Sequence, residues 1–162
     1  MPDLHIRPAV EKDLPEIRRL DKEAFPAEPY PDFVLRQYFD LYGDHMLVLD
    51  DGNALQGYLI AGVPPGGGLT WLLSIGVARD LRSKGLGREL VKKWLDHLHS
   101  EGVCEFRLAV DPDNAPAVHL YKSLNFTPLG GPRKDYYGPG RDRLLMALSL
   151  PASPTPTPPR TP

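Results

Sequence analysis

Apolar residues follow two different spacings along this chain, and these spacings predict alternating helices and strands. Apolar side chains recur every three or four positions between Leu86 and Leu98, as on one face of a helix, and Gly102 ends that segment. Short apolar runs bounded by glycine, proline or aspartate are typical of strands. We expect strands at residues 4–7, 46–49, 55–63, 71–77, 104–110, 126–129 and 143–148, and helices at 13–25, 32–41, 86–101 and 115–124.

The order of these elements predicts the fold class. The expected order is one strand, two helices, three strands, one helix, one strand, one helix and two strands. A short turn at residues 51–53 joins two of the strands as a hairpin. This order is typical of an α/β (α+β) domain with a mixed, mainly antiparallel sheet flanked by helices. Asp13 and Asn114 stand where the first and last helices begin, and each is expected to cap its helix.

The last twelve residues differ in composition from the rest of the chain. They contain six prolines, separated mainly by serine and threonine, and no large apolar side chain. A segment of this kind has almost no apolar surface to bury, so we expect an extended, disordered tail over residues 151–162. A chain of 162 residues suits one domain, which we place at residues 1–150.

The charge and the cysteine content exclude or disfavour several classes of protein. Lys and Arg number 19 and Asp and Glu 21, so a net charge of −2 gives no overall basic field for nucleic acid. No apolar run approaches the roughly 18 residues of a membrane helix, and the N-terminus lacks the apolar core of a signal peptide. Cys104 is the single cysteine, so we expect a reducing, cytoplasmic setting. His97 and His99 would face different directions on a helix, and no metal site is predicted.

The most informative segment, residues 77–88, lies between an apolar strand and an amphipathic helix. Gly85 and Gly87 would let the backbone approach a ligand closely or adopt a positive φ. The first turn of a helix leaves four N–H groups unpaired and carries partial positive charge, which together suit a phosphate or pyrophosphate. Arg82, Lys84 and Arg88 add cations to this segment.

Other nucleotide-binding loops fit this segment less well. A Walker loop requires lysine and then serine or threonine after its last glycine, but Arg88 and Glu89 follow Gly87. A dinucleotide fingerprint requires a third glycine where Leu90 stands. The alternative without a ligand is a plain helix start with two flexible residues and solvated charges.

The pattern Arg82-x-x-Gly85-x-Gly87 resembles the pyrophosphate loop of the GNAT superfamily of N-acetyltransferases. A second block, which runs Asn-Ala-Pro-Ala-Val-His-Leu-Tyr from Asn114 and continues to Phe126, stands at the spacing seen in that family. The resemblance covers residues 4–148. An early Pro-Tyr-Pro segment and a late Tyr-Tyr pair are most similar to the ribosomal-protein N-terminal acetyltransferase type.

The resemblance implies a single GNAT-like domain in which two central strands splay apart and acetyl-CoA, as acyl donor, binds between them. The pantetheine arm would pair with the backbone of residues 75–77 like an added strand, and the pyrophosphate would bind the amides of residues 83–88. Gly76 suits a bulge or a close approach. The residues assigned to acetyl-CoA are Ile75, Gly76, Val77, Arg82, Ser83, Lys84, Gly85, Leu86, Gly87, Arg88 and Asn114.

The resemblance also implies that Tyr121 is catalytic, donating a proton to the departing thiolate of coenzyme A. A phenol with an ordinary pKa of about 10 is protonated at neutral pH and can act in this way. The alternative role for Tyr121 is a core tyrosine. The general base of the most similar subgroup, a glutamate, is absent because Ala109 stands at its position. A water chain, a neutral fraction of the amine or a residue of the substrate would then have to take its place, and the candidate side chains are Glu23, Glu28, Asp32, Tyr136 and Tyr137.

The acceptor side should involve the first two helices and the last hairpin. Acidic residues predominate between residues 21 and 32, which favours a cationic acceptor or is simply a solvated face. The residues that we assign to acceptor binding are Glu28, Tyr30, Tyr136 and Tyr137.

The leading hypothesis is an acetyl-CoA-dependent N-acetyltransferase that acetylates a primary amine of a small molecule, such as a polyamine, an amino acid or an aminated antibiotic, by direct attack in a ternary complex. The alternatives are a protein N-terminal acetyltransferase and, from another class, a non-catalytic acyl-CoA-binding regulatory module. We predict no nucleic-acid or membrane partner, and the sequence leaves a homodimer open.

Overall fold

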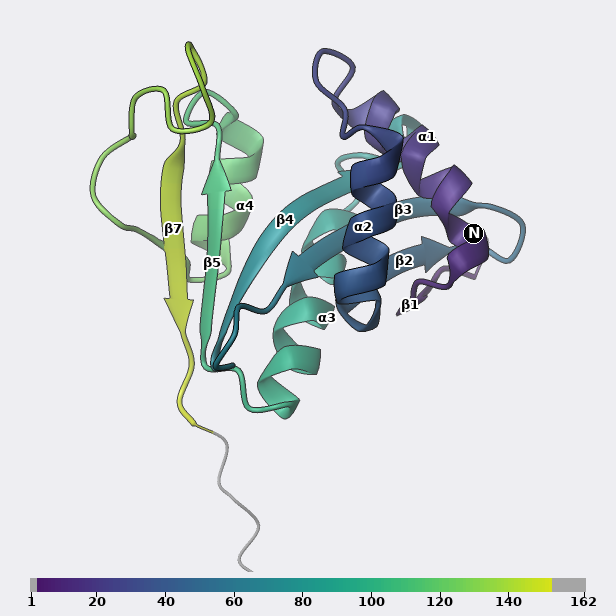
Figure 1. Ribbon diagram of the computed structural model, residues 1–162, viewed down its shortest axis with the longest axis horizontal. Helices are drawn as coiled ribbons and strands as arrows, with labels where there is room; N and C mark the ends of the chain where they lie inside the picture. Colours follow the sequence, from purple (N-terminus) through teal and green to yellow (C-terminus); the bar gives the residue numbers. More distant parts are fainter. Residues whose placement is uncertain (1–2, 153–162) are drawn as a thin grey trace, which may run out of the picture.

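A seven-stranded sheet forms the centre of the computed structural model, which describes residues 3–152 (Figure 1). The strands are β1 (His5–Pro8), β2 (Met46–Asp50), β3 (Leu55–Gly62), β4 (Leu69–Val77), β5 (Glu105–Val110), β6 (Thr127–Pro128) and β7 (Leu144–Ser149). Their order across the sheet is β1-β2-β3-β4-β5-β7-β6, and every neighbouring pair is antiparallel except β4 with β5. This arrangement confirms the predicted mixed, mainly antiparallel sheet.

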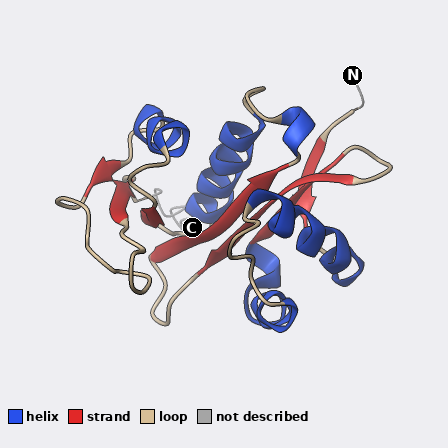
Figure 2. Ribbon diagram, turned by 90° about the horizontal axis from the view of Figure 1, so that it is seen from above, coloured by secondary structure: helices blue, strands red, loops and turns tan. Residues whose placement is uncertain are grey.

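Helices cover both faces of the sheet, so that the domain has two cores (Figures 1 and 2). The α-helices are α1 (Leu14–Ala24), α2 (Asp32–Tyr42), α3 (Leu86–Ser100) and α4 (Ala115–Ser123), and short 3-10 turns occur at Glu11–Asp13, Gly43–His45 and Arg79–Leu81. One core joins α3 and α4 to the sheet around Trp94 and Phe106, whose rings meet edge to face. The other joins α1 and α2 to the opposite face around Ile17 and Leu35.

The two central strands separate halfway along their length. β4 and β5 pair only from Leu69 with Glu105 to Leu72 with Leu108, and β4 then continues to Val77 without β5 beside it. The resulting opening between the strands is visible in Figure 1. The predicted splay of the central strands is therefore confirmed.

A β-bulge lies where the splay begins. Ile60 pairs with Ser74 but its neighbour Ala61 pairs with Leu72, so Leu73 is an extra residue on β4. We expected a bulge or a close approach of the donor at Gly76; the bulge is not there, and the close approach of the donor stays a prediction. The structure gives Gly76 a packing reason, because a Cβ on it would lie 2.6 Å from the Tyr58 ring. The bulge belongs to Leu73, where a regular alternation of apolar residues gave no signal for it.

Asp13 stands at the predicted N-cap position of α1, but the expected capping bond is absent. Its side chain instead accepts hydrogen bonds from the Arg7 guanidinium, at 2.7 and 3.0 Å, and from the Val10 N–H at 2.8 Å. Burial acts to raise the pKa of Asp13, but these hydrogen bonds outweigh it and lower the pKa below its usual range. The cause is tertiary, because Arg7 reaches Asp13 from β1. Asn114 does cap α4, since its Oδ1 accepts from the Ala117 N–H at 3.3 Å.

The C-terminal strand β7 ends at Ser149, and the Leu150 N–H donates to the Cys104 carbonyl at 2.8 Å. The proline-rich tail that we predict lies, beyond Ala152, outside the described residues, and the division of the chain at residue 150 stays a prediction. Within residues 3–152 no helix is long and apolar enough to cross a membrane.

Candidate active site

The loop between β4 and α3 exposes a run of backbone N–H groups at the open end of the splay. Ser83 and Gly85 have φ values of 64° and 78°, in the left-handed region, and these reverse the chain before α3 begins at Leu86. The first backbone acceptor used by α3 is the Gly85 carbonyl, which bonds the Glu89 N–H at 3.1 Å. Within the described chain, the N–H groups of residues 83–88 have no acceptor. Unpaired amides at a helix start form an anion-binding cradle.

The cations of this loop lie around the cradle rather than in it. Arg82 donates through Nε to the Val77 carbonyl at 3.1 Å, and Arg88 donates to Ser123 Oγ on α4 at 2.6 Å. An added Cβ on Gly87 would meet only Leu120 Cδ2, at 3.9 Å. The cradle is therefore made by main-chain groups, and the position of Gly87 has room for a side chain as far as the protein itself is concerned.

The predicted pantetheine segment, residues 75–77, forms one wall of the splay. Its backbone pairs with β3 on one side, through Leu59 with Ile75 and Gly57 with Val77, while β5 does not pair on the other side. The side chains of Ile75 and Val77 pack against the α3 core. Apart from the Val77 carbonyl, which accepts from Arg82, their backbone edge toward β5 is therefore free to bond a ligand, in the manner of an added strand.

Tyr121 lies on α4 and is 5% exposed, with its ring edge-to-face against Phe126 at 5.9 Å between centroids. Its hydroxyl has no hydrogen-bond partner among the described residues. Burial raises the pKa of Tyr121 to about 12, so the phenol keeps its proton at neutral pH and beyond. A protonated donor without a partner in the protein has the chemistry of a general acid.

The carboxylates considered as bases are engaged elsewhere. Ala109 pairs with Leu145 in the sheet, so this position of β5 offers no acid. Glu23 accepts from the Arg79 N–H at 2.9 Å, Glu28 forms an ion pair with Arg141, and Asp32 lies 3.6 Å from the Lys22 ammonium. The acidic stretch of residues 21–32 is thus paired with neighbouring groups rather than presented to an acceptor.

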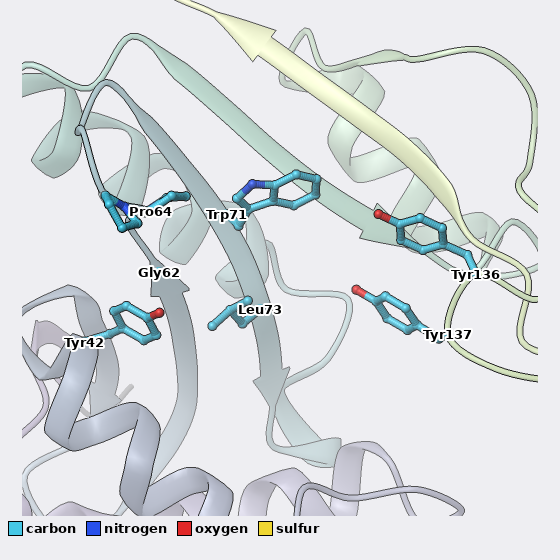
Figure 3. A pocket seen from close by; sticks show the side chains of 8 residues that line it. Tyr42, Gly62, Pro64, Trp71, Leu73, Tyr136 and Tyr137 are labelled. Carbon is cyan, nitrogen blue, oxygen red and sulfur yellow. The ribbon is translucent and has the colours of Figure 1, made fainter.

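A cavity of about 410 Å³ opens beside the splay, on the face of the sheet that carries α1 and α2 (Figure 3). Aromatic side chains dominate its wall, and the Tyr136 and Tyr137 rings, stacked at 5.6 Å, enter it from the loop before β7. We call this cavity the aromatic pocket. Its lining residues are Tyr42, Gly62, Pro64, Pro65, Trp71, Leu73, Tyr136 and Tyr137.

The other two predicted acceptor residues lie outside the lining of the aromatic pocket. The Tyr30 hydroxyl donates to the carbonyl of the bulge residue Leu73 at 3.1 Å, and desolvation raises the pKa of Tyr30. Glu28 contacts the tyrosine loop through Arg141. The structure thus brings Tyr136 and Tyr137 together in the pocket, sets Tyr30 against the bulge, and gives Glu28 an ion-pair partner.

Sequence reasoning missed a buried carboxylate, Asp21, which is 1% exposed. It accepts from the Tyr58 hydroxyl and from the Tyr30 N–H, both at 2.7 Å, and Tyr58 in turn bonds Ser74 at 3.0 Å. This network links α1, the loop that follows it and the bulge in β4. A signal existed, because Asp21 lies on the same helical stripe as Ile17 and would face the core there.

The sequence also contains no indication that the pocket is lined by Trp71, Leu73 and Tyr42. Each belongs to an element whose pattern predicts a core or surface role, and none lies in a motif that indicates acceptor binding. Their shared wall depends on how α2 and the tyrosine loop pack over β4, which only the folded chain shows.

Comparisons with known proteins agree with this geometry. The sequence model described as the acetyltransferase (GNAT) family matches residues 14–126. An N-alpha-acetyltransferase of Sulfolobus acidocaldarius is 30% identical over 159 residues, covering 90% of this chain and 92% of that protein. A mycothiol acetyltransferase of Kocuria rhizophila is 36% identical over 96 residues, 56% of this chain, but the chain spans only about a third of that relative, 32%.

The fold matches solved structures over nearly its whole length. The ribosomal-protein-S18-alanine N-acetyltransferase from Escherichia coli superposes with a TM-score of 0.82 at 26% identity, covering 93% of this chain and 96% of that one. The chain therefore belongs to the acetyltransferase (GNAT) family. This confirms the family and the fold that the sequence indicates.

Proposed function

We propose that this protein transfers the acetyl group of acetyl-CoA to the α-amino group of a protein or peptide N-terminus. The observation that carries the proposal is the aromatic pocket, which starts at the bulge residue Leu73 and has no carboxylate in its lining. An apolar, concave wall beside the reacting position suits the first side chains of a peptide. The similarity to N-terminal acetyltransferases in sequence and fold supports the same assignment.

The proposal departs from our leading sequence hypothesis, a small amine such as a polyamine. A polycation would need several open carboxylates, and those of residues 21–32 are already paired. The similarity to a mycothiol acetyltransferase keeps a small-molecule acceptor as the competing outcome of the test.

In the proposed reaction the donor lies in the splay, with its pyrophosphate on the amides of residues 83–88 and its pantetheine along residues 75–77. The neutral amine attacks the thioester carbonyl carbon, the carbon–sulfur bond breaks, and a freed backbone N–H of β4, where the splay begins beside Leu73, polarises the carbonyl oxygen. Tyr121 gives its proton to the thiolate and regains one from solvent. Water accepts the proton that the amine loses, because Ala109 offers no base.

The test measures coenzyme A release with three acceptor sets: peptides with free N-termini, the same peptides with blocked N-termini and internal lysines, and small amines including polyamines and amino acids. We expect turnover on the free N-termini and a mass gain of one acetyl group at the first residue. Turnover only on small amines would overturn the acceptor assignment. Thermal stabilisation by acetyl-CoA without turnover on any set would favour the binding module.

A homodimer and a cytoplasmic location stay predictions alongside this proposal. Gel filtration with light scattering measures the first, and fluorescence microscopy of the tagged full chain measures the second.

A further inference from the structure

Three aromatic rings of the pocket each carry an arginine on one face. Arg107 lies over Trp71, Arg133 over Tyr136 and Arg143 over Tyr137, at 6.0, 5.7 and 4.7 Å from the guanidinium carbon to the ring centroid. Arginine is the cation most often held over an aromatic face in this way. All three pairs lie at one pocket, where the guanidinium groups create a local positive field.

Two of these guanidinium groups form no ion pair with the part of the chain that the structure describes. Arg107 is paired with Glu105 at 2.9 Å, but Arg133 and Arg143 have no carboxylate within ion-pair distance in residues 3–152. Arg143 donates instead to the Asp142 carbonyl, at 2.7 Å. A planar guanidinium held on a ring keeps its N–H edge available for a bidentate carboxylate.

The acids of the same loop are used by its own backbone. Asp135 accepts from the Gly140 N–H at 2.7 Å, and Asp142 accepts from the Asp135 N–H at 2.9 Å. These bonds shape the turn that carries the two tyrosines, so these carboxylates are held by backbone N–H groups and not by Arg133 or Arg143.

The register of the sheet sets the distance between this positive field and the reacting amine. The amine would lie at the splay, which begins after Leu72, whereas Trp71 and Arg107 are partners in the last paired stretch of β4 and β5. At about 3.3 Å per residue, two or three extended residues reach from the splay to these side chains. The second or third acceptor residue therefore comes beside the arginines.

We infer that the preferred acceptor is a peptide N-terminus with an acidic side chain at its second or third position. The inference rests on the proposed function, because it names the peptide class that the same site takes. The acidic stretch of residues 21–32 suggests a cationic acceptor, whereas this inference names an acidic one.

The experiment compares three peptides that differ only at positions two and three, which carry glutamate, glutamine or lysine. We expect kcat/KM for the glutamate peptide to exceed that for the lysine peptide about tenfold at low salt, and the advantage to shrink as ionic strength approaches about 0.5 M. Equal kcat/KM for all three peptides would overturn the acidic preference and leave N-terminal acetylation intact. A failure of all three peptides to react would overturn both proposals.

Variants then separate the arginines from general charge effects. Arg133→Met and Arg143→Met keep the long apolar stem and remove the charge, so each should reduce the glutamate advantage while the glutamine peptide changes less than about twofold. Arg36→Met is the matched control, because Arg36 lies 5.9 Å over the Phe39 ring on α2, away from the pocket. An equal loss of the glutamate advantage in the control would contradict the inference.

Discussion

The proposed donor side and the proposed acceptor side of the site are built in opposite ways. The cradle proposed for the donor consists of main-chain groups from one short segment, residues 83–88, and from the edge of β4 that faces the splay. The aromatic pocket proposed for the acceptor is lined mainly by side chains from α2, β4 and the tyrosine loop, which are far apart in the sequence. Backbone groups are the same whatever the residue, so the donor side can be constant while the acceptor side varies.

The difference predicts which substitutions act on which substrate. Changes in the cradle should affect the donor and leave the acceptor side alone, and changes in the pocket should do the reverse. Four substitutions test this division, taken from the largest expected effect to the smallest.

Gly87→Glu should weaken coenzyme A binding at least about 100-fold, or roughly 3 kcal/mol. The substitution places a carboxylate where the pyrophosphate would lie, and the open space around Gly87 lets the domain keep its fold. Calorimetric titration measures the affinity, and the melting temperature checks the fold. Gln37→Glu adds the same charge on the exposed side of α2 and should change neither. Unchanged affinity in Gly87→Glu would refute the cradle.

Tyr121→Phe should lower kcat about 100-fold and leave the Kd of coenzyme A unchanged. Because burial raises the pKa of Tyr121 to about 12, the proton stays on the phenol through pH 10, and the rate should not fall there from its ionisation. The measurement is kcat against pH for both proteins. A falling limb near pH 10 that disappears in Tyr121→Phe would contradict the effect of burial.

Asp21→Ala should lower the free energy of unfolding by about 2–3 kcal/mol, because the Tyr58 hydroxyl and the Tyr30 N–H lose their acceptor in a buried site. Asp21→Asn keeps one carbonyl acceptor and should cost about half as much. Urea unfolding measures both. We also expect the acceptor KM to rise in Asp21→Ala, because Tyr30 holds the bulge. Equal stability of the two variants would argue against the network.

Trp71→Ala should raise the acceptor KM about tenfold while the KM of acetyl-CoA stays within about twofold, since the Trp71 side chain lines the aromatic pocket and the proposed donor cradle is made of main-chain groups. Leu41→Ala, which removes a 70% exposed apolar side chain from α2, is the control and should alter neither KM. Steady-state kinetics with each substrate varied in turn separates the two constants. An equal rise in both KM values would break the division between the two sides.

The same division explains what the sequence could predict. The cradle depends on neighbours in sequence, with glycines at residues 85 and 87 between a strand and a helix, so a pattern reveals it. The pocket depends on packing, and nothing in the sequence around Trp71 or Tyr42 predicts that they share a wall. Asp13 shows the same limit: its position before α1 predicts a cap, but Arg7 on a neighbouring strand binds it instead. The bulge at Leu73 is set by pairing with β3, which the alternation of residues does not encode.

The splay also has a mechanical consequence. Strand pairing between the β1–β4 half of the sheet and the half formed by β5, β7 and β6 is limited to four residue pairs in the described chain, from Leu69 with Glu105 to Leu72 with Leu108. A pantetheine arm bonded along residues 75–77 would lengthen this short seam. Bound acetyl-CoA would then make the two halves of the sheet more rigid. Amide hydrogen exchange along β4 should slow when acetyl-CoA binds and return to its original rate when coenzyme A dissociates.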